Sequence, residues 1–468
     1  MNAFSSDTLV MLHLGLGSFH RAHQAMYLQR LIDRGDTRWA LAGGNLRPDL
    51  ADTVEALVRQ GGAYTLETIS PTGEHRYQRI TALRQVLPYE PGIPGLVALG
   101  ASHTTRIISF TVTEAGYYLD PHDRLDPGFA DLAADLERAR RGEAGQTIYG
   151  ALTALLRARR AAAAGPVTLL NCDNLRHNGE RFRAGLLQFI DRLGDAGLRA
   201  WVERHTTSPN AMVDRITPRP APEVRQRVKA ATGLDDAAAV MGEEFTQWVI
   251  EDHFCHGRPA WEAVGVQMVA TVAPYEEAKI RILNATHSCI AWAGTLVGLN
   301  YIHEGTHHPA IRRFAHAYVT DDVMPALSPS PIDLATYRDT VLARFGNPAL
   351  RDTNQRVAMD GFAKIPGFIA PTVRERLGRS KPIAGVAMLP ALFLAFLQRW
   401  HRGELPYTYV DQGMDPVAAH AICTAADPVA ALCDDPALWG PQAGDMRLVE
   451  AVRAAGERVA QFVKEGAA

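Results

Sequence analysis

Short apolar segments alternate with amphipathic stretches through the first 270 or so residues of the chain. Residues 9–16 and 39–43 are short and apolar, and residues 19–34 between them carry apolar side chains at helical spacing. A turn with two glycines, residues 15–17, joins the first apolar segment to the helical one. The order of strand, glycine turn, helix and strand predicts a βαβ unit at the start of the chain.

The same alternation continues towards residue 273. Apolar segments at 105–113, 166–171 and 264–273 predict further strands. Helical patterns lie between them at 131–164, with a break near two glycines, and at 178–193. Strands that alternate with helices form mostly parallel sheets with both faces covered. The expected fold class is therefore α/β, with a Rossmann-type, mostly parallel sheet.

The pattern changes after Pro274, where helical segments follow one another and β-branched runs are scarce. Two domains are therefore expected: an α/β domain at residues 1–274 and a mostly α-helical domain at residues 275–468. The clearest helical patterns of the second domain are 309–319, 331–345, 386–402, 416–423 and 446–464.

The charge balance and the length of the apolar runs argue against two classes of partner. The 468 residues include 48 basic and 51 acidic ones, and the formal net charge of −3 argues against a general nucleic-acid surface. The longest apolar run, 383–397, is shorter than the about 20 residues that span a bilayer, and Pro390 interrupts it. Neither nucleic acid nor a membrane is an expected partner.

The five cysteines form no C-x-x-C pair, so a disulfide framework or a structural zinc site is not expected. The N-terminal residues carry polar side chains and no basic stretch, which is not the pattern of a signal peptide. A reducing compartment, the cytoplasm, is the expected location.

The glycine turn is suited to a dinucleotide. Gly15 and Gly17 follow a strand and precede a helix, where a pyrophosphate can approach the backbone closely. The usual third glycine position holds His20, so a glycine turn of an unrelated α/β protein remains an alternative. Asp49 follows the second strand, where a carboxylate can bind an adenosine ribose and repel the extra phosphate of NADP. Arg47 nearby leaves both cofactors open, and a solvated loop acid is the alternative for Asp49.

The stretch 275–287 has the composition of a catalytic helix. At about 100° per residue, Asn284 and His287 lie about 140° and 80° from Lys279, so the three share one side of a helix. Burial would favour the neutral amine of the lysine, which could accept a hydroxyl proton. The amide and the imidazole could donate hydrogen bonds to the oxygen as it becomes a carbonyl, while a hydride leaves the same carbon for a nicotinamide. A polar helix face at the surface is the alternative.

Together, residues 15–24 (GLGSFHRAHQ) and the spacing Lys279-x4-Asn284-x2-His287 resemble the mannitol dehydrogenase family of polyol-specific long-chain dehydrogenases. The resemblance covers essentially the whole chain. It implies an NAD-binding Rossmann-type domain at residues 1–274, a helical substrate and catalytic domain at residues 275–468, NAD as the cofactor and no metal.

The resemblance also implies roles for single residues. Lys279 matches the general base, and Asn284 and His287 match the pair that holds the reacting oxygen. An aspartate can accept two hydroxyl hydrogens, whereas arginine and lysine can donate to substrate oxygens, although surface ion pairs are the alternative for all of these. The implied substrate residues are Asn174, Asp214, Arg356 and Lys364, and the implied cofactor residues are Gly15, Gly17, Ser18, Phe19, Asp49, Thr113, Glu114 and Asn174.

Three further features have competing interpretations. Residues 303–307 match the H-E-x-x-H motif of zinc proteases, but Gly305 and Pro309 favour a loop between helices. Residues 275 and 279 match the Y-x-x-x-K pair of short-chain dehydrogenases, without the serine expected upstream. Glu276 lies three residues before the lysine and either guides its proton outward, tunes the lysine or is a surface acid at a helix start.

The expected function is NAD-dependent oxidation of a secondary alcohol of a sugar alcohol to a ketose. The glycine turn and the short N-terminus are most similar to family members that act on D-arabinitol, which implies D-arabinitol to D-xylulose. Oxidation of D-mannitol and reduction of fructuronate remain open, as does a non-catalytic nucleotide- or sugar-binding protein. The expected partners are the small polyol and ketose; a monomer is compatible with the sequence, which leaves the oligomeric state open.

Overall fold

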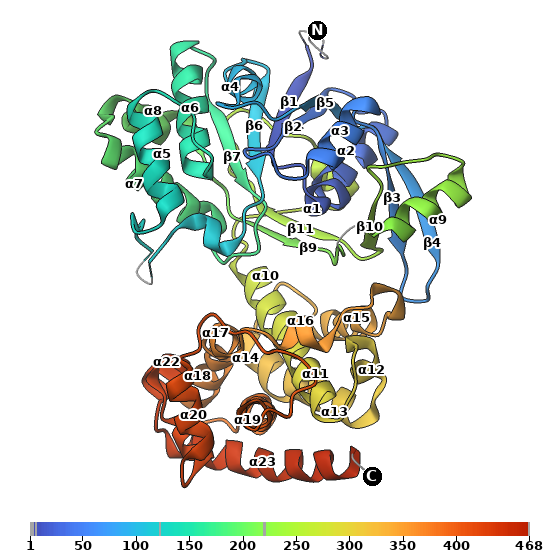
Figure 1. The fold of residues 1–468 in the computed structure, drawn as a ribbon, viewed down its shortest axis with the longest axis vertical. Coiled ribbons are helices and arrows are strands. Elements are labelled where there is room, and N and C mark those ends of the chain that lie inside the picture. The colour runs from blue at the N-terminus through green and yellow to red at the C-terminus, as the bar shows by residue number, and fades with distance from the viewer. Residues whose placement is uncertain (1–3, 5–6, 121–122, 219–220, 467–468) are drawn as a thin grey trace. The chain divides into compact units, whose positions relative to one another are not determined.

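The computed structural model describes residue 4 and residues 7–120, 123–218 and 221–466, without the side chains of residues 114 and 115. Contacts within the chain divide it into two compact units. The α/β unit comprises Met1–Ser70 and Glu74–Ala273, and the helical unit comprises Pro71–Gly73 and Pro274–Ala468. Figure 1 shows the strands in the first of these and the succession of helices in the second.

A six-stranded parallel sheet forms the centre of the α/β unit, in the order β5-β2-β1-β6-β7-β8. The chain passes from β1 to β2 on one side and returns to β6 on the other, so the strand order reverses beside β1, as in dinucleotide-binding sheets. The predicted parallel α/β sheet is confirmed. Its strands are β1 (Leu9–Leu14), β2 (Trp39–Gly44), β5 (Leu83–Leu87), β6 (Thr105–Phe110), β7 (Val167–Asn171) and β8 (Thr206–Thr207).

Helices cover both faces of this sheet because successive strand residues point to opposite sides. Met11 packs in one hydrophobic core, and its neighbours Val10 and Leu12 pack in the other. The first core holds α1 (Ser18–Ala22), α2 (Gln24–Asp33) and α3 (Ala51–Arg59); the second holds α4 (Pro94–Gly100), α5 (Ala130–Arg140), α6 (Ile148–Ala161), α7 (Asn178–Leu193) and α8 (Ala196–His205).

Two smaller sheets, β10-β3-β4 and β12-β11-β9, were not predicted. The strand β4 reads HRYQRI and is mostly polar, so it has no apolar run that would reveal it. The strand predicted at 264–273 is reduced to the three residues Gln267–Val269. Val264, where the predicted strand begins, is the last residue of a 3-10 helix. The elements are β3 (Tyr64–Ile69), β4 (His75–Ile80), β9 (Ala211–Asp214), α9 (Pro222–Thr232), β10 (Val240–Glu243), β11 (Gln247–Glu251), η2 (Trp261–Val264) and β12 (Gln267–Val269).

Two predicted elements of this unit have different bounds. The helix predicted at 19–34 is divided at His23, whose φ and ψ of −121° and −82° are not helical, so α1 and α2 are separate. The strand predicted at 105–113 ends at Phe110, which leaves Thr111 and the residues after it in a loop at the carboxyl end of β6. The break predicted within 131–164 is present between α5 and α6.

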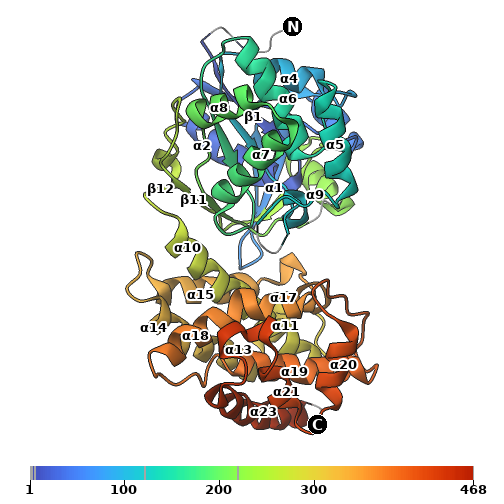
Figure 2. The ribbon, with the colours of Figure 1, turned by 90° about the vertical axis from the view of Figure 1, so that its left-hand side faces the viewer.

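The helical unit is built around α11, of whose twelve residues all but His287 are buried. The helix predicted at 386–402 is α19, and the ring centroid of its Phe393 lies 5.0 Å from that of Trp292 in α11. Figure 2 shows both helices among their neighbours. The elements are α10 (Ala273–Ala278), η3 (Lys279–Asn284), α11 (Ala285–Leu296), α12 (Ile302–His307), α13 (Pro309–Ala317), η4 (Tyr318–Val323), α14 (Met324–Leu327), α15 (Leu334–Phe345), η5 (Pro348–Leu350), α16 (Asn354–Ala358), α17 (Gly361–Lys364), η6 (Ile365–Ile369), α18 (Ala370–Gly378), α19 (Met388–His401), α20 (Pro416–Thr424), α21 (Pro428–Cys433), α22 (Pro436–Trp439), η7 (Gly440–Gln442) and α23 (Met446–Gly466).

The described residues contain no helix with the length and apolar character needed to cross a bilayer.

Candidate active site

The glycine turn after β1 leaves room for a ligand against its backbone. Gly15 has φ of +109°, a conformation that other residues rarely adopt. A Cβ atom built on Gly15 or Gly17 would meet nothing within 4 Å, so the space beside both is open. Ser18 and Phe19 follow directly and are only half-buried. These four predicted cofactor residues therefore form one accessible turn at the strand-order reversal, which fits the pyrophosphate of a dinucleotide.

His20, at the usual position of the third glycine, points into the core instead of towards this space. Its ring stacks on His13 of β1 with centroids 3.5 Å apart, and both rings are fully buried. Burial lowers the pKa of His20 to about 3, so the ring is neutral at physiological pH. The histidine therefore packs beneath the turn and adds no charge to it.

Asn45, which sequence analysis did not assign, joins the glycine turn to the loop that carries Asp49. Its Oδ1 accepts a hydrogen bond from the Leu16 N–H at 2.8 Å, and its Nδ2 donates to the Asp49 carbonyl at 2.7 Å. The Asp49 side chain itself is exposed. Arg47 pairs with Asp131 at 2.9 Å, so its guanidinium is already engaged in the α/β unit.

The carboxyl ends of β6 and β7 are held together by Asp173. Its Oδ1 accepts from the Val112 N–H and its Oδ2 from the Tyr117 hydroxyl, both at 2.5 Å. Asn171 Nδ2 donates to the Tyr117 oxygen at 2.7 Å and to Asp173 Oδ2 at 3.1 Å. Burial raises the pKa of Asp173 to about 7, against the opposing effect of these hydrogen bonds.

Three predicted residues flank this network. Thr113 lies exposed in the loop after β6, and Asn174 lies exposed directly after Asp173. Glu114 begins the 3-10 helix η1 (Glu114–Tyr117), and its side chain lies outside the described part of the structure.

Asp214 ends β9 in the α/β unit and is 5% exposed. The start of β9 is fixed by Asn178, which exchanges hydrogen bonds of 2.7 and 3.0 Å with the backbone of Ala211. The next residue, Arg215, is also buried and donates to the Glu243 carbonyl at 2.8 Å. The position of Asp214 is therefore set by buried hydrogen bonds on both sides.

In the helical unit, the predicted catalytic helix contains a π-helical turn, Lys279–Asn284. A π turn closes i→i+5 hydrogen bonds and so places residues five apart closer to one face than a regular α-helix does. Lys279 is 8% exposed, and Asn284 and His287 are half-buried. Single π turns inside α-helices occur frequently at functional sites, and sequence analysis predicted only a regular helix here.

His287 lies against a carboxylate that sequence analysis did not identify. Its Nε2 is 3.1 Å from Asp352 Oδ2, an ion-pair distance without hydrogen-bond alignment. Its ring stacks on Phe345 with centroids 4.3 Å apart. Burial lowers the pKa of His287, and the carboxylate of Asp352 only partly opposes this, so the imidazole is neutral at physiological pH.

Asp352 joins His287 to the predicted substrate residue Arg356, and the predicted Lys364 is close enough to influence His287 electrostatically. Arg356, on α16, donates from Nε to Asp352 Oδ1 at 2.7 Å, while most of its side chain is exposed. Lys364, on α17, donates to the Val357 carbonyl, and burial lowers its pKa to about 8, partly offset by Asp360. The positive charges of Arg356 and Lys364 both lower the pKa of His287, so the structure brings these three predicted residues close to one another.

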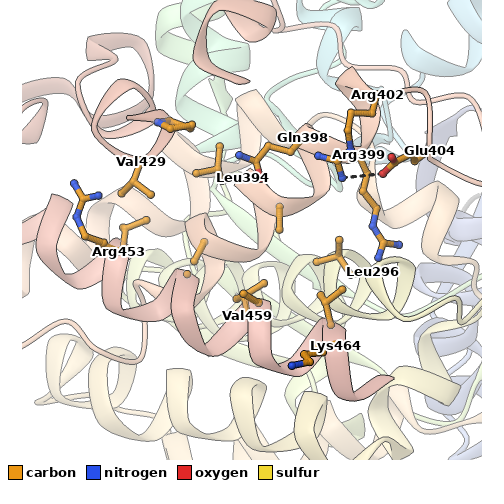
Figure 3. Close-up of a pocket in the computed structure, with 17 residues that line it drawn as sticks. Leu296, Leu394, Gln398, Arg399, Arg402, Glu404, Val429, Arg453, Val459 and Lys464 are labelled. Atoms are coloured by element: carbon orange, nitrogen blue, oxygen red, sulfur yellow. Dashed lines mark ion pairs between the residues drawn. The ribbon is translucent and has the colours of Figure 1, made fainter. Parts of the chain in front are cut away.

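The helical unit also contains a cavity of about 670 Å³ that is not lined by these residues (Figure 3). Its walls come mainly from α19 and α23 and include the apolar Leu394 and Val459 and the cationic Arg399 and Lys464. None of the predicted site residues lines it. Its mostly apolar walls are not suited to a polyol, which needs several hydrogen-bonding groups.

The H-E-x-x-H residues form the helix α12, so the predicted loop is wrong. Glu304 Oε2 accepts hydrogen bonds from the Asn300 and Tyr301 N–H groups, both at 2.9 Å, and this cap allows a helix to start in spite of Gly305. Within the described ranges, no three or more His, Cys, Asp or Glu side chains are grouped as a metal site would require.

Known proteins resemble the chain along nearly its full length. The family model described as the mannitol dehydrogenase Rossmann domain matches residues 10–263, and the mannitol dehydrogenase C-terminal domain matches residues 271–460. A D-arabinitol 4-dehydrogenase of Ralstonia nicotianae is 60% identical over 453 residues, with 96% of each chain covered. A D-arabinitol 4-dehydrogenase of Klebsiella pneumoniae is 54% identical, covering 96% of this chain and 97% of the other.

Solved structures extend the comparison. A substrate-free D-sorbitol dehydrogenase is 31% identical and superposes with a TM-score of 0.87, covering 99% of this chain and 98% of its own. The Pseudomonas fluorescens mannitol 2-dehydrogenase in complex with NAD and D-mannitol is 32% identical, with a TM-score of 0.81 and coverage of 99% and 95%.

Proposed function

The chain belongs to the mannitol dehydrogenase family, and we propose that it oxidises D-arabinitol to D-xylulose with NAD. The observation that carries the choice of substrate is the 60% identity with a D-arabinitol 4-dehydrogenase over 96% of both chains. A mannitol 2-dehydrogenase of Cereibacter sphaeroides is 39% identical over 82% of this chain, so mannitol is the second candidate. The resemblance seen in the sequence and the expected class, an NAD-dependent polyol dehydrogenase, are confirmed.

Cofactor binding is assigned to residues 1–274, and substrate binding and catalysis mainly to residues 275–468, in accord with the ranges of the two family models. The turn at Gly15 and Gly17 fits the pyrophosphate, and the exposed Asp49 fits a ribose without an extra phosphate. Bound NAD supplies the hydride acceptor. Thr113, Glu114 and Asn174 remain proposed cofactor residues on the loops that Asp173 fastens.

In the proposed reaction, Lys279 accepts the proton of the reacting hydroxyl. Asn284 and His287 hold the oxygen by hydrogen bonds, and the π turn is expected to bring Asn284 towards the face of Lys279. Asp214, Arg356 and Lys364 bind the remaining hydroxyls, and Glu276, buried one turn before Lys279, is the proposed outlet for the proton. A site that forms hydrogen bonds with several hydroxyls at once disfavours a ligand that lacks them, so we expect it to select polyols.

All five cysteines are free thiols. This supports a reducing compartment, and we propose the cytoplasm.

A substrate panel tests the proposal: D-arabinitol, D-mannitol, D-sorbitol and xylitol for oxidation and fructuronate for reduction, each with the NAD and NADP forms of the cofactor. The highest kcat/KM is expected for D-arabinitol with NAD, by about 10-fold or more over a polyol with a mismatched hydroxyl. Chromatography should identify D-xylulose as the product. A higher kcat/KM for mannitol or fructuronate would replace the proposed substrate.

A further inference from the structure

The carboxylate of Asp352 faces one ring nitrogen of His287 in the helical unit. The separation of Nε2 and Oδ2 is 3.1 Å, and the Asp352 side chain is 10% exposed. The stack on Phe345 holds the imidazole ring from its flat side. Hydrogen bonds of catalytic groups are often poorly aligned before the substrate binds, so the present angle is compatible with a bond in the complex.

Asp352 stays ionised in this position. Burial alone would raise its pKa, but the imidazole of His287 and the guanidinium of Arg356 outweigh burial and hold the pKa below its usual range. An ionised carboxylate has no proton to donate and only accepts hydrogen bonds. Its neighbour His287 is neutral at physiological pH, because burial lowers the pKa of that ring.

We infer that Asp352 is a positioning residue that keeps the proton of neutral His287 on Nε2 and leaves Nδ1 as the acceptor for a substrate hydroxyl. The inference rests on the proposed function of this site. A neutral imidazole has one donor and one acceptor nitrogen, and the group facing the first nitrogen decides which is which.

This assignment revises the reaction proposed above, in which Asn284 and His287 both hold the reacting oxygen. His287 then accepts a hydrogen bond from a polyol hydroxyl next to the reacting carbon, and Asn284 alone donates to the oxygen that becomes a carbonyl. The same carboxylate holds Arg356 through Nε at 2.7 Å, so one residue orients an acceptor and a donor for the polyol.

The direct test is the tautomer of His287. In ¹⁵N NMR of the full-length protein labelled at histidine, the His287 resonances are assigned by their loss in His287→Gln. The wild-type protein should show the proton on Nε2 at neutral pH. In Asp352→Asn the side-chain amide can donate to Nε2, and the proton should move to Nδ1. A wild-type His287 with its proton on Nδ1 overturns the inference, whatever the activity of the variants.

Kinetics give a second readout. Asp352→Asn should lower kcat/KM for the polyol about 10- to 100-fold, as loss of the hydrogen-bond partner of a histidine does at metal sites, and leave KM for NAD unchanged. Asp339→Asn, which removes an exposed carboxylate paired with Arg338, is the matched control and should match wild type. Equal losses in polyol and NAD parameters, or a fall only in melting temperature, would indicate a structural role and reject the inference. If Asp352→Asn does not fold, the wild-type spectrum still decides.

Discussion

Two carboxyl groups withdrawn from solvent, one in each unit, have pKa values shifted in opposite directions. Asp173 in the α/β unit is 3% exposed and accepts hydrogen bonds from a backbone N–H, a tyrosine hydroxyl and an amide. Its pKa is raised to about 7 by burial. Asp352 in the helical unit is less buried, with a side chain that is 10% exposed, and its pKa is lowered because His287 and Arg356 outweigh the burial.

The comparison separates the roles of hydrogen bonds and charge. Both carboxyls are well supplied with donors, so donor number does not explain the difference. Neutral donors at Asp173 do not offset the loss of water, whereas the imidazole of His287 and the guanidinium of Arg356 offset the smaller loss at Asp352. Asp173 therefore joins two strand ends through a carboxyl group whose pKa lies near neutral pH. Asp352, in contrast, stays ionised beside the groups proposed for proton transfer.

The largest effect is expected from Lys279→Met, which removes the proposed base from the helical unit. kcat for polyol oxidation should fall about 10²- to 10⁴-fold, the usual contribution of a general base. In wild type, oxidation should slow as the pH falls and the amine takes up a proton. NADH affinity, measured by fluorescence titration, should be unchanged because the cofactor residues belong to the α/β unit. Lys381→Met, an exposed lysine of the same unit, is the control. Unchanged turnover in Lys279→Met would refute the base assignment.

The next largest effect concerns the pH dependence of stability at Asp173. Its pKa of about 7 in the folded chain lies above the about 3.9 of an unfolded aspartate. The folded state therefore holds this proton longer, so the contribution is present below pH 4 and is lost as the pH rises to 7. Asp173→Asn, which mimics the protonated form, should lack this fall of at most about 1.4 kcal/mol per pH unit.

The measurement is urea unfolding of wild type and Asp173→Asn at several pH values between 4 and 8. The difference between their free energies of unfolding should change across this window in favour of the variant. Asp131→Asn removes an exposed carboxylate paired with Arg47 in the same unit and should show no such trend. Parallel pH curves for wild type and Asp173→Asn would show that Asp173 is already ionised in the folded protein at low pH.

The sequence predicts the four inner strands of the central sheet, β1, β2, β6 and β7, because these are almost wholly buried. The edge strands were not predicted, since β5 is mostly half-buried or exposed and β8 has only two residues. The run 167–171 is apolar except for Thr168 and Asn171. A short, mostly apolar run of this kind is typical of a buried parallel strand. The hairpin strand β4 is half-exposed and polar, and it could not be distinguished from a loop. Strands are recognised in a sequence by the apolar residues that they bury, so a strand that buries few residues has only a weak sequence signal.

Spacing alone predicted the candidate site only where its residues are close along the chain, whereas Asp214, Arg356 and Lys364 came from the family resemblance. Lys279, Asn284 and His287 share one continuous helical segment, so their spacing could be read directly. The π turn between them has no sequence signal. Asp352 contacts His287 from 65 positions further along the chain, and only packing of the region around α16 against α11 brings it there. The charge that governs His287 therefore required the tertiary structure.

The smallest effect is expected at Glu304, a third carboxyl that separates burial from partner charge. Like Asp173 it accepts from backbone N–H groups, those of Asn300 and Tyr301, but it is only partly buried. These hydrogen bonds lower its pKa, with burial opposing them weakly, so neutral donors suffice once water still reaches the group.

Glu304→Gln should lower the free energy of unfolding by about 0.5–1 kcal/mol at pH 7, as loss of a helix cap does. Because the folded pKa is lowered, this contribution is present above the pKa of an unfolded glutamate and is lost as the pH falls through the folded value. Urea unfolding at pH 7 and pH 3 measures the difference, which should shrink at the lower pH. Polyol oxidation should be unchanged, since the motif caps α12 and has no proposed part in catalysis. A loss of turnover without a loss of stability would give the H-E-x-x-H residues a role in the reaction, and a difference that grew at pH 3 would contradict the argument that backbone donors alone hold a half-buried carboxylate ionised.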